Sequence, residues 1–266
     1  MFDRISLFDR IINKSRRTTV KYFGCRRYKL GNHDPIISFT FDDFPRSALV
    51  VGGSILKENA ATGTFYVSMG LLGQESNSGR IASLCDIQRL ISEGHELGCH
   101  TYSHQDGWKV RLQVFKESIA ANQKALGEYF PNRRFHVFAY PLNGPSIRIK
   151  NTIGNYFICC RGGGQKINSN IIDLNLLKAY FLDWRNRETS TVHREVIRKC
   201  VATRGWLIFA THDVDPNPSR YGCTPSLLEE LISYARKAGA RILPVAKACE
   251  ELGITALNQS LFPFTK

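Results

Sequence analysis

Residues 36–45 of the chain read IISFTFDDFP. The first six of these residues form an apolar, β-branched run, which is typical of a buried strand. The run stops abruptly at Asp42 and Asp43, and Pro45 follows two residues later. The stretch therefore predicts a buried strand that delivers two carboxylates to its C-terminal end.

Further strands alternate with helices along the 266 residues. The pattern predicts strands at 64–67, 95–99, 135–140, 156–160, 179–182, 206–210 and 242–245. It predicts helices at 86–93, 110–127 and 191–203, and one that opens at Thr224 and Pro225 and ends at Gly239. Strands that alternate with helices imply a parallel sheet. We therefore expect an α/β fold of a single domain, a distorted (β/α) barrel that is closed or nearly closed.

Polar side chains fall at the ends of these predicted strands. In α/β barrels the C-terminal strand ends converge on one active face, so residues far apart in sequence meet there. The set consists of the pairs Asp42 and Asp43, His100 and His104, and the single residues Asp183 and His212.

His100 and His104 are four residues apart and can share one face of a helical turn, where they would hold one metal ion. Without another ligand, two hydrogen-bonded surface histidines would be the simpler interpretation. A carboxylate from a second strand end makes a three-ligand site with open positions, which is the pattern of a catalytic metal. Because neighbouring residues leaving a strand point to opposite sides, one of Asp42 and Asp43 can bind the metal while the other acts as general base.

His212 follows the predicted strand WLIFA and is a candidate general acid, although a histidine at a strand end can also be purely structural. Asp183 is a candidate to orient it, and Asp213 is nearer in sequence for the same task. Trp184 is either an apolar wall for an acetyl methyl group or a core tryptophan. His95 precedes a strand, at the end opposite the predicted site, and we expect it to be structural.

Residues 162–164 read GGG after a predicted strand. Such a run can cradle a phosphate, but the Lys-Ser/Thr of a P-loop does not follow it, so the sequence alone favours a flexible turn. No G-x-S-x-G elbow is present, which argues against a serine hydrolase.

The formal net charge is +13 and the pI is about 9.5. Residues 1–30 carry nine Lys or Arg against two Asp, a net +7, so the other residues contribute +6. The excess therefore sits mainly in a leader, residues 1–30, and not across a nucleic-acid-binding face of the catalytic domain, residues 31–266. Apolar residues recur in the leader at helical spacing, which is compatible with peripheral membrane contact or with packing on the domain; they are Ile5, Phe8, Ile11 and Ile12.

No secretory h-region is found in the first residues, and no stretch approaches the length of a spanning helix. We therefore expect a cytoplasmic protein, and peripheral contact at the inner membrane face through the leader stays one of the two alternatives for that segment. The eight cysteines are scattered and contain no CxxC, so we expect reduced, mostly buried thiols.

Five motifs in this order resemble the polysaccharide deacetylase family, which is also described as the chitooligosaccharide/peptidoglycan deacetylase homology domain. They are SFTFDDFP, GHELGCHTYSH, FAYPLNG, LDW and LIFATHD. The resemblance runs from about residue 36 to about residue 252, and it implies a distorted (β/α) barrel and a Zn-type divalent ion. It also implies hydrolysis of N-acetyl, and sometimes O-acetyl, groups on sugars.

By matching position, the resemblance implies a role for each motif residue. Asp42 matches the catalytic base, and Tyr140 falls where the family uses a backbone N–H to stabilise the oxyanion. His212 matches the general acid, and Asp183 with Trp184 matches the Asp-Trp of the fourth motif. The implied metal ligands are Asp43, His100 and His104.

Two positions depart from the family pattern. Phe44 stands where the family often has Gly, so we expect it to narrow or reshape the mouth of the site. The third motif lacks an arginine that in the family pairs with the fourth-motif aspartate, and barrel geometry suggests Arg161 as a substitute. We expect Phe44, Pro141, Arg161 and Trp184 to contact substrate.

The sequence thus predicts a metal-dependent hydrolase that removes acetyl groups, most simply N-acetyl, from a sugar or glycan precursor in cell-surface polysaccharide biosynthesis. The expected cofactor is Zn, with Co, Ni, Mn or Fe as alternatives. A cytoplasmic enzyme would meet a nucleotide- or lipid-linked sugar. Two other readings are a metal-independent amidase acting on a small cyclic amide, and a non-catalytic glycan-binding module on the same fold.

Overall fold

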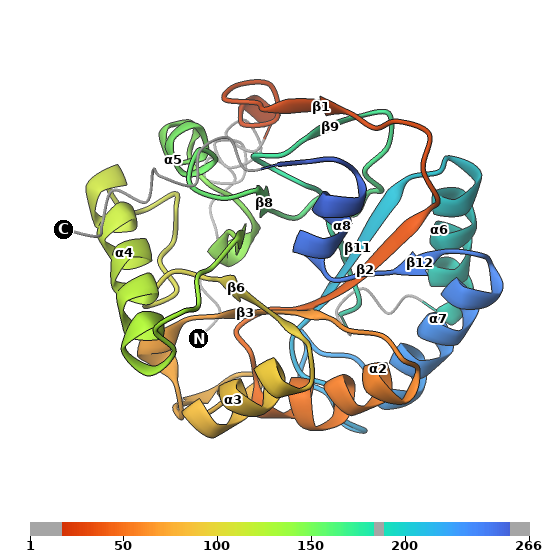
Figure 1. Cartoon of the computed structure of the whole chain (residues 1–266), viewed down its shortest axis with the longest axis horizontal. Coiled ribbons are helices and arrows are strands. Elements are labelled where there is room, and N and C mark those ends of the chain that lie inside the picture. Colours follow the sequence, from red (N-terminus) through yellow and green to blue (C-terminus); the bar gives the residue numbers. More distant parts are fainter. Residues whose placement is uncertain (1–17, 184–188, 256–266) are drawn as a thin grey trace, which may run out of the picture.

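The computed structural model describes residues 18–183 and 189–255, and a curled parallel sheet lies at its centre (Figure 1). The strand order is β10-β11-β2-β3-β6-β7-β8, with β12 also paired to β2, and every pairing in this sheet is parallel. The strands are β2 (Ile36–Phe41), β3 (Thr64–Val67), β6 (Glu96–Cys99), β7 (Val137–Ala139), β8 (Cys159–Arg161), β10 (Tyr180–Phe181), β11 (Trp206–Thr211) and β12 (Arg241–Ile242).

The predicted strand at residues 36–41 is β2, and all six of its residues are buried. It pairs with β11 along its whole length, from Ile36 beside Trp206 to Phe41 beside Thr211. A continuous apolar run is what a strand covered on both faces requires. The sheet forms a half-barrel, so the predicted distorted (β/α) barrel of one domain is confirmed.

Helices α2 to α7 surround the sheet, whereas α8 lies near the middle of the view (Figure 1). Ser83 caps α3 in a reciprocal capping box with Asp86, and Thr224 caps α7 ahead of Pro225. The helices are α2 (Ser54–Glu58), α3 (Leu84–Ser92), α4 (Leu112–Tyr129), α5 (Ile147–Ile153), α6 (Ser190–Ala202), α7 (Pro225–Lys237) and α8 (Val245–Glu251), with short η1 (Ala48–Gly53), η2 (Met69–Leu71) and η3 (Pro141–Asn143). Among the described residues, no helix is long and apolar enough to cross a membrane.

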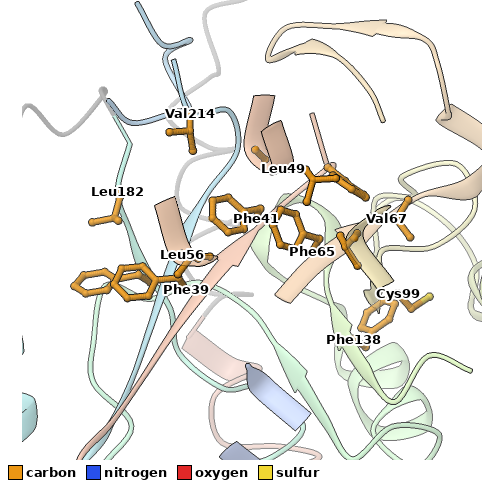
Figure 2. Close-up of a cluster of buried hydrophobic side chains, with 14 of the residues drawn as sticks. Phe39, Phe41, Leu49, Leu56, Phe65, Val67, Cys99, Phe138, Leu182 and Val214 are labelled. Carbon is orange, nitrogen blue, oxygen red and sulfur yellow. The ribbon is translucent and has the colours of Figure 1, made fainter. Parts of the chain in front are cut away.

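Aromatic side chains from neighbouring strands fill the core beneath the site (Figure 2). The rings of Phe41 and Phe65 stack with centroids 4.5 Å apart, and Phe44 packs against Phe65 at 5.1 Å. All three side chains are fully buried. Burial of an aromatic ring stabilises the fold by about 1.5–3 kcal/mol, so this cluster anchors the strand end that carries the two aspartates.

Residues 18–30 of the leader pack against the domain. Strand β1 (Arg27–Lys29) pairs antiparallel with β9 (Ile171–Asp173), as Figure 1 shows. The Nζ of Lys150 on α5, which is fully buried, donates to the carbonyl oxygens of Val20 at 2.7 Å and Phe23 at 2.9 Å. The apolar residues of the predicted amphipathic pattern lie outside the described residues, and so the membrane-contact prediction stays a prediction.

Glu96 ties the N-terminal ends of three elements together. Its carboxylate accepts hydrogen bonds from Thr64 Oγ1 on β3 at 2.6 Å and from the Ala246 N–H on α8 at 2.9 Å. Burial raises the pKa of Glu96 to about 7, and these hydrogen bonds only partly oppose that effect.

Six of the eight cysteines are buried, as expected, while Cys25 is partly exposed and Cys85 is exposed.

Candidate active site

Side chains that follow three strands meet at the end of the sheet where these strands terminate. Asp43 follows β2 by two residues, His100 follows β6 directly, and His212 follows β11 directly. His104 reaches the same place from the loop after β6. The predicted convergence of residues 57 or more positions apart is therefore present in the structure.

The backbone around the metal-site residues adopts left-handed conformations that non-glycine residues rarely use. The φ angles are 59° at Asp43, 53° at Phe44, 61° at Thr101 and 52° at His104. Residues 100–104 form an irregular loop, so the prediction that the two histidines share a helical turn is wrong. Strained conformations of this kind cost about 1–3 kcal/mol each and persist where surrounding structure fixes them, often at functional sites.

The two histidines point their Nε2 atoms at one carboxylate. Asp43 Oδ1 lies 3.4 Å from His100 Nε2 and 3.2 Å from His104 Nε2. His100 Nδ1 is 2.8 Å from the carbonyl oxygen of Ala139, which can only accept, so this nitrogen carries the proton. His100 therefore presents its Nε2 atom to the site, as metal-ligating histidines do.

Asp43, His100 and His104 fit a divalent transition ion. One atom from each lies within 4.8 Å of the other two, which is the spacing of ligands around a single ion. One carboxylate and two imidazoles suit Zn²⁺ and neighbouring first-row ions, and such a three-ligand set leaves coordination positions open.

Electrostatics at the site favour a charged aspartate and a neutral histidine. Burial alone would raise the pKa of Asp43, but the contact with His100 and the charges of His100, His104 and His212 hold it well below its usual value. Burial and the neighbouring His100 lower the pKa of His104. At neutral pH these are the protonation states that metal binding requires.

Asp42 does not belong to the three-ligand cluster. Its side chain is 3% exposed, and its Oδ1 accepts a short hydrogen bond from Nη2 of Arg161, which is fully buried at the end of β8. The guanidinium also lies 5.0 Å from the ring centre of Tyr66. The Arg161 guanidinium therefore holds the Asp42 carboxylate in place and balances its negative charge. The two neighbouring aspartates thus have separate roles.

His212 faces the cluster from β11. Its Nε2 is 3.7 Å from Asp43 Oδ2, and its Nδ1 is 3.3 Å from the carbonyl oxygen of Tyr221. The carbonyl accepts, so Nδ1 carries a proton and Nε2 is the nitrogen presented to the site. Asp213 does not orient this ring, because its carboxylate accepts from the N–H and the Oγ of Ser219, both at 2.6 Å.

Comparisons with known proteins show what this chain is similar to. Residues 29–153 match the sequence model of the family described as polysaccharide deacetylase. A chitin deacetylase from Arthroderma benhamiae is 42% identical over 71 residues, which are 26% of this chain and 18% of that protein. A bifunctional xylanase/deacetylase from Pseudobutyrivibrio xylanivorans is 25% identical over 224 residues, 82% of this chain and 31% of that protein. These comparisons support the polysaccharide deacetylase family for this chain.

The chain spans less than a third of the length of these two relatives. Solved structures share its fold. The Xyl-CE4 domain of a multidomain xylanase from the hindgut metagenome of Trinervitermes trinervoides gives a TM-score of 0.61 at 20% identity, over 86% of this chain and 96% of that chain. A family 4 acetyl xylan esterase from Clostridium thermocellum, in complex with a cobalt ion, gives 0.61 at 19% identity, over 85% and 95%. Members of this family are hydrolases that act on amide or ester bonds.

Two expectations drawn from the deacetylase motifs need correction. The backbone N–H of Tyr140 donates to the Arg161 carbonyl at 2.9 Å as part of the pairing between β7 and β8, so it is not available to an oxyanion. On the same loop the Leu142 N–H makes no hydrogen bond within the described residues, and its φ of 54° breaks the turn. Phe44 does not narrow the mouth, because its side chain is fully buried against Phe65.

The remaining predicted residues of the deacetylase site are placed as follows. Arg161 does enter the site, but its partner is Asp42, whereas the resemblance suggested Asp183. Asp183 is buried at the end of the segment that follows β10. Pro141 is buried at the start of η3, which limits its contact with substrate. Trp184 lies outside the described residues. His95 is structural, as predicted, because its Nδ1 accepts from the Gly63 N–H at 3.1 Å.

Proposed function

We propose that this chain is a metal-dependent deacetylase that hydrolyses the N-acetyl group of an amino sugar. The observation that carries the proposal is the division of labour between neighbouring aspartates. Asp43 faces His100 and His104, whereas Asp42 is held apart from that cluster by Arg161. A three-ligand metal set beside a separately held carboxylate is what metal-assisted amide hydrolysis requires.

The side chains of this site supply the proton transfers. A divalent ion held by Asp43, His100 and His104 would supply Lewis-acid polarisation of the acyl oxygen and of water. Asp42 accepts the proton of the attacking water, and its hydrogen bond to Arg161 keeps it oriented for that task. The Leu142 N–H is the candidate donor to the developing oxyanion, since it lies on the loop after β7 without a partner among the described residues.

His212 completes the reaction as the general acid. With Nδ1 held by the Tyr221 carbonyl, a proton on Nε2 faces the site and can pass to the leaving nitrogen. The bond that breaks joins the acetyl carbon to the sugar nitrogen, and the products are acetate and a free amino sugar. An amine nitrogen must be protonated before it can leave, whereas an alkoxide is a better leaving group and depends less on a proton donor, so the well-placed His212 favours an amide.

We also propose that the enzyme acts in the biosynthesis of cell-surface polysaccharide. A cytoplasmic location, which we propose with it, would favour a nucleotide- or lipid-linked precursor. The basic residues of the leader support contact with an anionic membrane surface. Vesicle flotation tests that contact: replacing Arg10, Lys14, Arg16 and Arg17 by Gln should release the protein from anionic vesicles, and unchanged flotation would contradict it.

The test of the function is acetate release from N-acetylated nucleotide sugars, lipid-linked sugars and chitooligosaccharides, with acetylated xylan as the ester comparison. Wild type and Asp42→Asn should be assayed with and without chelator. Release that chelator and the substitution both abolish supports the proposal and identifies the substrate class. Release that survives complete metal removal would contradict it and favour a metal-independent amidase. Glycan binding without release, with metal verified in the site, would instead support the non-catalytic module.

A further inference from the structure

A cavity lies between the leader and the loop that follows β8, and none of the metal-site residues lines it. Its volume is about 340 Å³. We call it the basic pocket, and Figure 1 shows β1 and β9, which contribute to its walls, beside each other. Its defining residues are four cations and two glycines: Lys21, Arg27, Lys166, Lys178, Gly163 and Gly164.

The four cationic side chains have no acidic partner. All four are exposed, and no carboxylate within residues 18–183 and 189–255 forms an ion pair with them. The one acid on the pocket wall is Asp173, and its Oδ2 already lies 2.6 Å from Nζ of buried Lys150. The cavity therefore carries a concentrated positive charge that nothing in the described chain compensates, and such a field attracts a multiply charged anion.

The walls of the basic pocket are fixed by partly buried polar contacts. The backbone N–H of Arg26 donates to Asp173 Oδ1 at 3.0 Å, and the guanidinium of Arg26 donates to the Phe157 carbonyl at 3.1 Å. Asn175 Nδ2 donates to the Gly24 carbonyl at 2.9 Å. These contacts hold the leader against β9 and against the segment that precedes β8, so the cations project from an ordered surface.

Two residues of the glycine run at 162–164, Gly163 and Gly164, form part of this wall. Gly163 donates its N–H to the Asn143 carbonyl at 3.2 Å, which fixes the turn. Gly164 has a φ of 132°, a conformation that glycine adopts freely. Its N–H has no hydrogen-bond partner within the described residues, so it remains available to an acceptor. An amide without a partner beside lysines is a feature of anion-binding loops.

We propose that the basic pocket binds a phosphoryl group, carried by a phosphate ester or a pyrophosphate. A phosphate presents about two negative charges and three acceptor oxygens to lysines, arginine and backbone N–H groups, whereas a carboxylate offers one charge and two oxygens. Four cations gathered around one cavity match the more highly charged ligand. The proposal goes beyond deacetylation and does not depend on it. The phosphoryl group can come from a soluble phosphorylated sugar or from a membrane phospholipid.

Cys25 provides a readout inside the pocket. It lines the cavity and is partly exposed, Cys85 on α3 is exposed elsewhere, and the other six cysteines are buried. The full chain is alkylated with a neutral maleimide at constant ionic strength, and the rates at both thiols are followed by mass spectrometry. Inorganic pyrophosphate at ten times its Kd should slow alkylation of Cys25 about tenfold and leave Cys85 unchanged.

A variant pair separates the pocket from general charge effects. Lys166→Ala combined with Lys178→Ala should abolish protection of Cys25, while the charge-matched control, Lys124→Ala combined with Lys237→Ala, should keep it. All four substituted side chains are exposed, so folding is not at risk. No protection in wild type, or equal protection in both variants, would overturn the proposal.

Vesicles distinguish the two sources of phosphate. Protection by pyrophosphate but not by vesicles containing phosphatidic acid would assign the pocket to a soluble phosphorylated ligand. Protection by those vesicles, and not by phosphatidylcholine vesicles, would assign it to a membrane headgroup. Protection by phosphatidylcholine vesicles to the same extent would mean that adsorption, and not phosphate recognition, shields Cys25, and this would overturn the proposal for the membrane source. Neither arm measures acetate release, so failure here is distinct from failure of the deacetylase proposal.

Discussion

Replacing Arg161 by Met removes a fully buried cation from its partner Asp42, which is 3% exposed. The methionine fills most of the space, so the main effect is an unpaired buried carboxylate. Breaking one side of a buried ion pair costs about 3–5 kcal/mol. We expect the free energy of unfolding to fall by that amount in a urea titration. Arg134→Met, an exposed control, should stay within about 0.5 kcal/mol of wild type.

A double-mutant cycle tests the physical reason. Asp42→Asn alone leaves Arg161 buried without a counter-charge and should cost a similar amount. The double variant holds no buried charge at this place, so its cost should be well below the sum of the two single costs. We expect a coupling energy of at least about 2 kcal/mol, within the range measured for residues in contact. Additive costs, or a loss below about 1 kcal/mol in Arg161→Met, would refute the buried pair.

The same substitution should weaken catalysis more than substrate binding. Arg161 orients the base and does not touch the metal-site ligands, so Arg161→Met should lower kcat by about 10²–10³ with bound metal unchanged. Metal content by mass spectrometry and kcat measured under folded conditions check this. An unchanged kcat would show that Asp42 does not depend on Arg161.

Three further outcomes are expected. His212→Gln should lower kcat about 10²–10⁴-fold while metal binding persists, because His212 is an acid and not a ligand; loss of metal would contradict this. Lys150→Met should cost about 3 kcal/mol by leaving Asp173 unpaired and should open the leader to protease, as limited proteolysis would show; an uncut leader would contradict it. Burial raises the pKa of Glu96 from 4.5 to about 7, so the folded protein binds this proton more tightly than the unfolded chain. Stability should therefore fall by roughly 3 kcal/mol as pH rises through that window, and Glu96→Gln should flatten the slope in urea titrations; equal slopes would contradict it.

The strands and most helices could be predicted because their sequence periods are local. The β-branched run at residues 36–41 and the capped helix after Thr224 each carry their own signal. Strand β9 and helix α5 are among the elements that the sequence pattern does not predict, because their stability comes from partners distant in sequence. Lys150 on α5, for example, is buried only because the leader covers it.

The sequence predicts the site only in part. Polar residues that directly follow an apolar strand can be recognised in the sequence, whereas the backbone conformation of the loops cannot. Asp43, His100 and His104 meet as expected, but the loop at 100–104 is irregular, and no residue pattern reveals left-handed Thr101 and His104. The Tyr140 N–H was misassigned because β7–β8 pairing consumes it, which requires knowledge of the register. The partner of Arg161 likewise depends on how far β8 lies from β2 around the barrel.

The most direct test of the metal site is the titration of chelator-stripped enzyme with Zn²⁺ while acetate release is followed. For wild type we predict no release at zero metal and a linear rise that stops at one equivalent. His104→Ala should bind less than one equivalent and remain inactive across the same range, and its fold, checked by circular dichroism, should be intact because this side chain is partly exposed. Full acetate release by the stripped wild type, or a wild-type titration curve reproduced by His104→Ala, would contradict the assignment of Asp43, His100 and His104 as the metal ligands of a deacetylase.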